Sequence, residues 1–205
     1  MGKIYSEVAA ERVTNWLYAN NDYNEIDYLK AKLGIEATVI NISKIAIVYL
    51  ISCIFSLLVP TLITHLSYLS LRRCSRGLHA KSSFICTIVS IMMFVLIPSL
   101  LQDVIIGNDL LFLIGTTSTI LFGIYAPSDT EKAPIIGVER RKKLKRLTIL
   151  MNGIILIIAL LAESTIFRTL IVAGSLMQLV MILPITYKIL GRSCNNYEEY
   201  ETELQ

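Results

Sequence analysis

The chain has 205 residues, of which 54% are hydrophobic and only 17% charged, and its formal net charge is +3. A mean hydropathy of +0.62 excludes an ordinary soluble domain, and so small a positive charge does not indicate a nucleic-acid partner. Because lipid cannot satisfy free backbone amides, the long apolar runs should be helices. The sequence therefore predicts an all-α polytopic membrane protein with about five to six hydrophobic segments in contact with lipid.

The first predicted elements are two amphipathic helices within residues 1–39. Apolar residues recur at helical spacing from Ile4 to Leu17 and again from Ile26 to Leu33. The polar stretch at residues 20–24 should separate the two helices, with Asn24 or Asp22 capping the second. Such helices commonly lie along the membrane surface. No cleaved signal peptide is expected ahead of them.

Five apolar stretches follow and are predicted to cross the membrane. Their approximate bounds are residues 40–62, 84–101, 110–126, 147–162 and 166–187. Pro60 lies near the end of the first stretch, and residues 61–71 are amphipathic enough for an interfacial or re-entrant segment. We divide the chain into N-terminal helices (1–39), a transmembrane catalytic domain (40–190) and a cytoplasmic tail (191–205).

Loop charges predict the orientation. Two loops, residues 72–81 and 132–146, are rich in Arg and Lys, whereas the loop at 102–109 contains acids and no base. The two basic loops and the tail should therefore be cytoplasmic and the acidic loop external. Five simple spans would leave the N-terminus outside, although amphipathic N-terminal helices usually meet the cytoplasmic leaflet. The alternative is a chain that doubles back within residues 40–71.

A histidine and a cysteine lie seven residues apart at the mouth of the second apolar stretch. His79 and Cys86 are the parts of a cysteine nucleophile and its base. On one straight helix they would lie about 10.5 Å apart along the axis, too far for contact. We therefore expect a non-helical or sharply bent backbone between Gly77 and Ser83.

The residues around this pair are compatible with such a bend. Gly77 permits a sharp turn, and Ser82 or Ser83 can cap the helix that contains Cys86. A helix N-terminus with positively charged Lys and Arg side chains nearby would favour the thiolate form of Cys86. Residue types alone favour a simpler alternative, a basic cytoplasmic loop with an incidental His and a small apolar Cys.

Two motifs add weight to the catalytic interpretation. Residues 72–86 read R-R-C-S-R-G-L-H-A-K-S-S-F-I-C, and residues 125–135 read Y-A-P-S-D-T-E-K-A-P-I ahead of a basic run. Together they resemble the accessory gene regulator B family of Gram-positive bacteria, and the resemblance covers the chain from the N-terminal helices to the last span. Arg76 replaces a glycine that many members have, and the spacer before Pro134 is one residue longer than the commoner form.

The resemblance implies a bacterial membrane cysteine endopeptidase that processes the precursor of a cyclic autoinducing peptide for quorum sensing. It implies that Cys86 is the nucleophile and His79 its base, and that Arg72 and Gly77 match positions needed for activity. Arg72 could anchor a substrate carboxylate or the loop, Gly77 is expected to act through conformation, and Ser82 could support the site. The expected partner is a precursor peptide with an amphipathic N-terminal part and an acidic tail. No cofactor or metal is expected, and a homodimer stays open.

Other polar residues are weaker candidates. We expect Asp129 and Glu131 to be exposed loop carboxylates, His65 to be interfacial, Cys53 to be a packing residue, and Cys74 and Cys194 to be free surface thiols. The rival function is a non-enzymatic transporter or accessory subunit. Scarce charge within the apolar stretches disfavours this rival.

Overall fold

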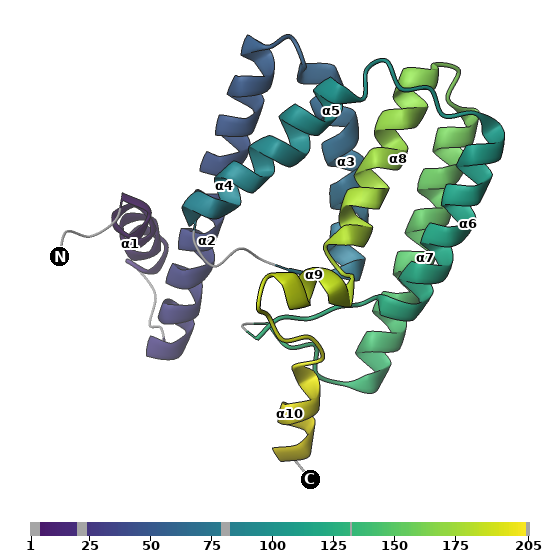
Figure 1. The fold of residues 1–205 in the computed structure, drawn as a ribbon. Helices are drawn as coiled ribbons and strands as arrows, with labels where there is room; N and C mark the ends of the chain where they lie inside the picture. Colours follow the sequence, from purple (N-terminus) through teal and green to yellow (C-terminus); the bar gives the residue numbers. More distant parts are fainter. Residues whose placement is uncertain (1–4, 20–23, 79–82, 132, 204–205) are drawn as a thin grey trace. The chain divides into compact units, whose positions relative to one another are not determined.

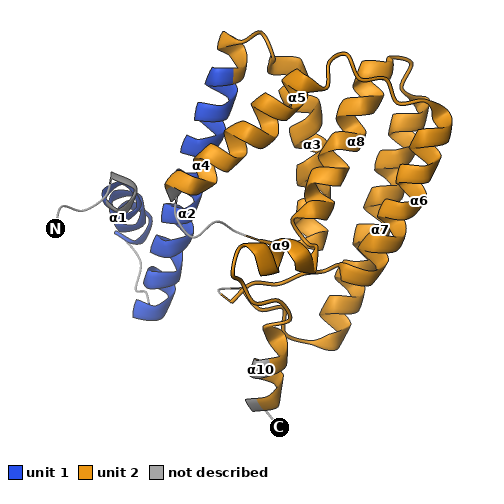
Figure 2. Ribbon diagram, in the orientation of Figure 1, with its two compact units in different colours: residues 1–51 blue, residues 52–205 orange. Residues whose placement is uncertain are grey.

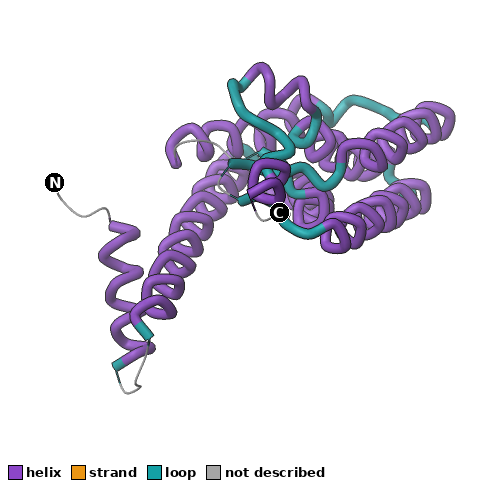
Figure 3. The backbone as a smooth tube through the Cα atoms, turned by 90° about the horizontal axis from the view of Figure 1, so that it is seen from below, coloured by secondary structure: helices purple, strands orange, loops and turns teal. Residues whose placement is uncertain are grey.

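The computed structural model describes residues 5–19, 24–78, 83–131 and 133–203. All regular secondary structure in these ranges is helical, as predicted (Figure 1; purple in Figure 3). The chain forms two compact units, residues 1–51 and residues 52–205 (Figure 2). The helices are α1 (Tyr5–Tyr18), α2 (Glu25–Ile54), α3 (Leu58–Ser75), α4 (Ser83–Ile91), α5 (Ile97–Leu100), α6 (Asn108–Tyr125), α7 (Val138–Leu161), α8 (Thr165–Val180), α9 (Pro184–Ile189) and α10 (Tyr197–Glu203), with a π-helical turn at Met92–Leu96 between α4 and α5.

The first unit contains α1 and most of α2, and the predicted break between them is confirmed. The side chain of Asn24 caps α2 by accepting a hydrogen bond from the Ile26 N–H at 3.2 Å. The two helices contact each other through the Tyr28 hydroxyl, which donates to Asn15 Oδ1 at 2.5 Å. Trp16 on α1 is 77% exposed, as expected for a helix with an apolar face toward lipid.

The predicted span at residues 40–62 is wrong, because α2 ends at Ile54 and a new helix begins at Leu58. The Leu57 N–H donates to the Ser52 carbonyl at 2.7 Å across the turn, and Ser56 has a φ of 57°. Pro60 lies in the first turn of α3, where a missing N–H costs no helical hydrogen bond. The helix is thus interrupted within residues 40–71, and the doubling back of the chain there stays a prediction. No helix ends at residues 39–40, since α2 is continuous there, and the functional division at residue 39 stays a prediction.

The second unit is built on α3, α6, α7 and α8. Its core includes Leu71, Phe122, Ile155, Leu179 and Ile182. The tightest approach is between α3 and α8, where a Cβ added to Gly174 would lie 2.4 Å from the Thr64 carbonyl oxygen. Small residues at helix contacts are typical of membrane bundles, because close backbone approach replaces the hydrophobic driving force that lipid removes.

The helix that contains Cys86 is distorted in its second half. Pro98 lacks an N–H, so it leaves the Phe94 carbonyl four residues earlier without its helical donor. The Thr61 hydroxyl of α3 donates to that carbonyl at 2.6 Å. The π-helical turn at Met92–Leu96 precedes the proline. This hydrogen bond ties the α4–α5 segment to α3.

The predicted last span at residues 166–187 is too long, because α8 ends at Val180 and α9 starts only at Pro184. Proline favours the start of a helix and ends a preceding one. Among the described residues, α2, α6 and α7 are long and apolar enough to cross a membrane, and residues 84–100 and 165–180 form shorter apolar helices. The polytopic membrane fold is confirmed.

The loops of the second unit gather at two opposite ends of its helices (Figure 1). At one end, Arg168 on α8 donates to Asn108 Oδ1 at 2.8 Å, and the Thr169 hydroxyl donates to the Val104 carbonyl at 2.7 Å. The other end holds the C-terminus of α3, the start of α7 and the chain after α8. The predicted basic loop at 132–146 and the span start at 147 are wrong in their bounds, because α7 already begins at Val138. The basic start of α7 nevertheless lies at the other end from the acidic loop, as the charge pattern requires.

Candidate active site

Helix α3 ends ahead of the predicted catalytic pair, in a turn at Ser75–Leu78. Arg76 has a φ of 58° and Gly77 a φ of 109°, both in the left-handed region that L side chains rarely adopt. An unbroken helix from Arg72 to Cys86 is therefore absent, and the expected bend is confirmed. His79 and Ser82 lie outside the described residues, so their placement stays a prediction.

Arg72 holds this turn. Its Nη1 donates to the Arg76 carbonyl at 2.8 Å and its Nη2 donates to the Leu78 carbonyl. A guanidinium presents a rigid fork of donors, so one side chain can fix two carbonyls at once. Of the two roles considered for Arg72, the geometry supports anchoring the loop.

Gly77 is enclosed on several sides. A Cβ at this position would lie 2.7 Å from the Met181 carbonyl oxygen, 2.9 Å from Arg72 Nη1 and 2.9 Å from Ile182 Cγ2. Its N–H donates to the Ser128 carbonyl at 2.9 Å. Both the positive φ and the lack of space require glycine here, which fits the expectation of a conformational role.

The segment after α6 supports the turn from a distant part of the chain. Besides the Gly77 bond, the Ser128 N–H donates to the Ser75 carbonyl at 3.0 Å, so residues 75–77 and Ser128 pair as in a short parallel bridge. The Leu78 N–H donates to the Met181 carbonyl at 3.1 Å. Backbone groups from two remote segments thus fix the chain just before His79.

Asp129 is not an exposed loop carboxylate, since only 3% of its surface is accessible. Its carboxylate accepts hydrogen bonds from the backbone N–H groups of Asn196 and Tyr197, each at 3.0 Å, and thereby caps α10 from across the fold. The Tyr187 hydroxyl donates to the Asp129 carbonyl at 2.7 Å and accepts from the Ser128 hydroxyl at 3.0 Å. Burial raises the pKa of Tyr187 to about 12, so the phenol stays a donor at neutral pH.

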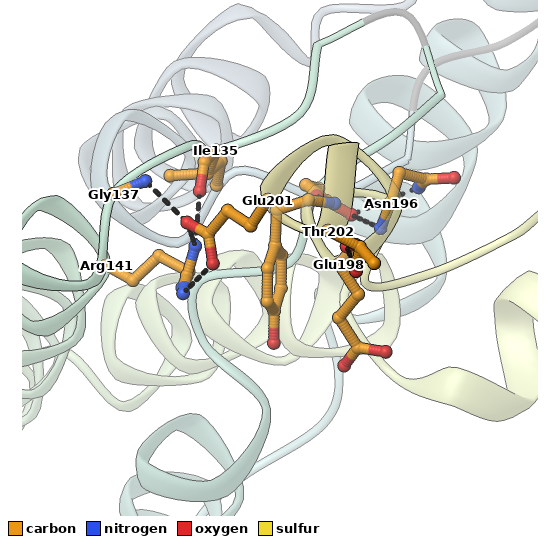
Figure 4. Close-up of polar contacts among 9 residues, drawn as sticks. Ile135, Gly137, Arg141, Asn196, Glu198, Glu201 and Thr202 are labelled. Atoms are coloured by element: carbon orange, nitrogen blue, oxygen red, sulfur yellow. Dashed lines mark hydrogen bonds and ion pairs between the residues drawn. The ribbon is translucent and has the colours of Figure 1, made fainter. Parts of the chain in front are cut away.

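The C-terminal residues are docked through charged contacts (Figure 4). The Arg141 guanidinium binds the Glu201 carboxylate with both nitrogens, at 2.7 and 3.0 Å, and the Gly137 N–H donates to the same carboxylate at 2.9 Å. Glu131 is exposed, as expected, and accepts from Arg192 at 3.0 Å. A cavity of about 460 Å³ lies beside these contacts, lined in part by Tyr125, Ser128, Arg141, Lys145 and Tyr197.

Cys86 lies in the first turns of α4, which begins at Ser83, and is half-buried with a free thiol. Tyr68 on α3 lies within electrostatic reach of both Arg72 and Cys86. Its ring and that of His65 pack on Phe94, with centroid distances of 5.1 and 4.4 Å. The π-helical turn that follows α4 is thus packed against an aromatic face of α3.

The remaining candidates are placed as follows. His65 is buried beside Phe94 rather than interfacial, and Cys53 is exposed rather than packed. Cys194 is an exposed free thiol, as expected, and Cys74 is half-buried. Within the described ranges, no group of three or more His, Cys, Asp or Glu side chains could hold a metal.

Gln178 is the residue at this site that sequence reasoning missed. It is fully buried, and its Nε2 donates to Ser75 Oγ and to the Arg76 carbonyl, each at 2.7 Å. The sequence did contain a signal for it, a strongly polar amide within the apolar run at residues 169–183. Polar side chains inside membrane helices are costly and often functional, so such a residue is a candidate for a role at the site. The position of its partners, about one hundred residues away, could not have been inferred.

The sequence model of accessory gene regulator B matches residues 10–182. The chain is 44% identical to an AgrB-like protein of Listeria innocua over 94% of this chain and 95% of the relative. It is 38% identical to an AgrB-like protein of Clostridium acetobutylicum, over 97% and 95%. It is 34% identical to accessory gene regulator protein B of Staphylococcus haemolyticus, over 86% and 93%. No solved structure matches.

Proposed function

Because this chain belongs to the accessory gene regulator B family, we propose that it is a membrane-embedded cysteine endopeptidase. Its substrate is a short precursor peptide with an amphipathic N-terminal part and an acidic tail. Cleavage passes through a thioester acyl-enzyme, and the peptide is then cyclised to a thiolactone or lactone autoinducer for quorum sensing. The active site faces the cytoplasm of the bacterial cell.

The observation that supports this proposal is the break between α3 and α4. The helix stops at Ser75, the backbone turns through Arg76 and Gly77, and a new helix begins at Ser83 with Cys86 in its first turns. A histidine seven residues before a cysteine can approach it only if the helix is interrupted. The fold therefore meets the geometric condition for a His79–Cys86 pair.

The chemistry follows from the two side chains. The Cys86 thiolate attacks the peptide carbonyl, and the C–N bond breaks as His79 protonates the leaving amine. The retained peptide is then a thioester on Cys86. His79, now neutral, accepts the proton of a cysteine thiol or serine hydroxyl within that peptide as this group attacks the thioester carbonyl. The ring closes, the bond to Cys86 breaks and the Cys86 thiolate is released beside the protonated His79. Exchange to a thiolactone is close to thermoneutral.

Cysteine substitutions test the nucleophile. Cys86→Ala and Cys86→Ser should abolish precursor cleavage, measured by mass spectrometry with purified protein in lipid nanodiscs. Cys53→Ala, Cys74→Ala and Cys194→Ala are the matched controls and should leave cleavage largely intact. His79→Ala should also fail, because the thiol loses its base and the leaving amine its proton source. Full processing by Cys86→Ala would eliminate the peptidase and favour the non-enzymatic transporter or accessory subunit.

A modified precursor separates the two half-reactions. When the ring-forming residue of the precursor is changed to Ala, the wild-type protein should still cleave, or should accumulate a thioester adduct. The first step needs no acceptor thiol, so the adduct should form on Cys86 and be released by hydroxylamine. A protein that neither cleaves this precursor nor forms an adduct with it would contradict the acyl-enzyme route.

A further inference from the structure

Gln178 is connected to the turn before His79 by both of its amide hydrogens. Its Nε2 donates at 2.7 Å to Ser75 Oγ and at 2.7 Å to the Arg76 carbonyl. The Arg76 carbonyl also accepts from Arg72 Nη1 at 2.8 Å. Two donors from different helices therefore converge on one carbonyl oxygen, and both of its lone pairs are used.

The position of Gln178 is set by the rigid contact of α3 with α8. The two helices run parallel, because Ser67 Oγ donates to the Ile171 carbonyl at 2.7 Å and Ser75 lies opposite Gln178. Gly174, one turn before Gln178, approaches Thr64 and Ser67 so closely that no side chain fits there. The backbone of α8 at Gln178 is therefore held close to the C-terminal end of α3.

The hydrogen bonding of Gln178 suits positioning better than stabilisation. Its Oε1 is buried and has no hydrogen-bond partner among the described residues, and an unsatisfied buried acceptor lowers stability. Arg76 adopts a φ of 58°, which an L side chain keeps only when its surroundings enforce it. Gln178 and Arg72 are the side chains that bind its carbonyl and enforce this conformation.

We propose that Gln178 is a positioning residue of the proposed peptidase. It holds the Ser75–Arg76 turn in its conformation of positive φ, so that the chain at Gly77 and Leu78 leaves α3 in one fixed direction ahead of His79. This inference rests on the proposed function. Precursor binding does not depend on Gln178, whereas the attack of Cys86 on the peptide carbonyl does, through the placement of the base.

Gln178→Leu and Asn152→Leu form a matched pair. Asn152 is also a fully buried amide of this bundle, and it binds Ser175 and Thr119 at 2.8 and 2.9 Å, away from the turn. Single-turnover cleavage in nanodiscs should be about 10- to 100-fold slower for Gln178→Leu, since misplaced catalytic groups cost rate of this order. The protein concentration that gives the half-maximal rate should be unchanged. Asn152→Leu should lower thermal stability and leave the cleavage rate per folded molecule near wild type.

Gln178→Glu supplies a second readout. A protonated carboxyl can donate one hydrogen bond to the Arg76 carbonyl, whereas a carboxylate would repel it. The cleavage rate of Gln178→Glu per folded molecule, relative to wild type, should therefore increase as pH falls. Loss of folded protein at high pH is measured separately by thermal unfolding.

A wild-type rate for Gln178→Leu, or equal slowing by Asn152→Leu, would overturn the positioning role. The same assay with Cys86→Ala keeps the two proposals separate. Cleavage by Cys86→Ala contradicts the peptidase itself, whereas inactive Cys86→Ala with fully active Gln178→Leu contradicts only the role of Gln178.

Discussion

At the scale of single residues, the site depends on backbone conformations that few side chains tolerate. Arg76 and Gly77 both have positive φ, and the space around Gly77 is filled by the Met181 carbonyl and the side chains of Arg72 and Ile182. The turn between α3 and α4 is therefore determined by close contacts as well as by hydrogen bonds. A substitution that adds a single methyl group in this turn should therefore lower stability and slow cleavage.

Gly77→Ala should destabilise the protein by about 1–3 kcal/mol and slow cleavage, because the added Cβ combines backbone strain with a steric overlap. Thermal unfolding in nanodiscs and precursor cleavage measure the two effects. Gly153→Ala on α7 is the control, since a Cβ there meets nothing within 4 Å and alanine favours a helix. Equal behaviour of the two variants would contradict the enclosed turn.

Tyr187→Phe should cost about 1–2 kcal/mol, because the hydroxyl bridges Ser128 and Asp129 in a buried place. Tyr200→Phe, at an exposed position, should leave stability unchanged.

The contribution of Tyr187 to stability should also depend on pH. Because the folded pKa of Tyr187, about 12, lies above the usual value of 10.0, this contribution is fully present below pH 10 and is lost as pH rises through 12. Thermal unfolding of both variants and the wild type tests this.

At the scale of elements, the chain after α8 is a structural part of the second unit. Asp129 caps α10, Glu131 binds Arg192, and Arg141 binds Glu201. These contacts connect α10 to the segment at Ser128 that pairs with the turn before His79. The predicted cytoplasmic tail is therefore a support of the site.

Glu201→Gln should increase hydrogen exchange in α10, because it removes a bidentate ion pair and weakens the bond from Gly137. Exchange detected by mass spectrometry on the peptide that contains residues 195–203 measures the effect. Glu139→Gln removes only an exposed ion pair with Lys142, three residues along α7, and should change little. Unchanged exchange in Glu201→Gln would show that the ion pair does not hold α10.

Lowering the pH should weaken the contacts that hold α10 against the rest of the second unit. Hydrogen bonds from Arg141 and Gly137 lower the pKa of Glu201 below 4.5, and those from Ser193 lower the pKa of Glu131. A lowered folded pKa contributes stability above the unfolded value of 4.5, and that stability is lost as pH falls through the folded pKa. After correction for intrinsic exchange rates, protection of residues 195–203 should be constant at neutral pH and should fall below about pH 4.5.

At the scale of the whole molecule, the two ends of the second unit should face opposite sides of the membrane. In a background without Cys53, Cys74 and Cys194, Lys143→Cys should be labelled only from the cytoplasm and Gly107→Cys only from outside. Lys143 and Gly107 are both exposed. Reversed labelling would contradict the positive-inside orientation and the cytoplasmic active site.

Much of the architecture could be predicted from the sequence because it depends on local patterns. Hydropathy over about 20 residues identifies helices in lipid, and the polar stretch at residues 20–24 identifies the start of α2. The seven-residue spacing of His79 and Cys86 requires an interruption if the two are to pair. Element ends were predicted less well. Pro60 was assigned to the end of one helix and begins another, since proline is tolerated at a helix start and also follows a helix end.

Only the tertiary structure decided what surrounds the turn before His79. Gln178 binds Ser75 across 103 positions of the chain, and Asp129 binds Asn196 across 67. A local pattern shows that a polar group is present but cannot show its partner, so Asp129 was expected to be exposed and Gln178 was overlooked. Burial and hydrogen bonding depend on which segments the packing of α3 against α8 brings together. For this reason the sequence identified the proposed nucleophile and base, whereas the residues that position them became visible only in the folded chain.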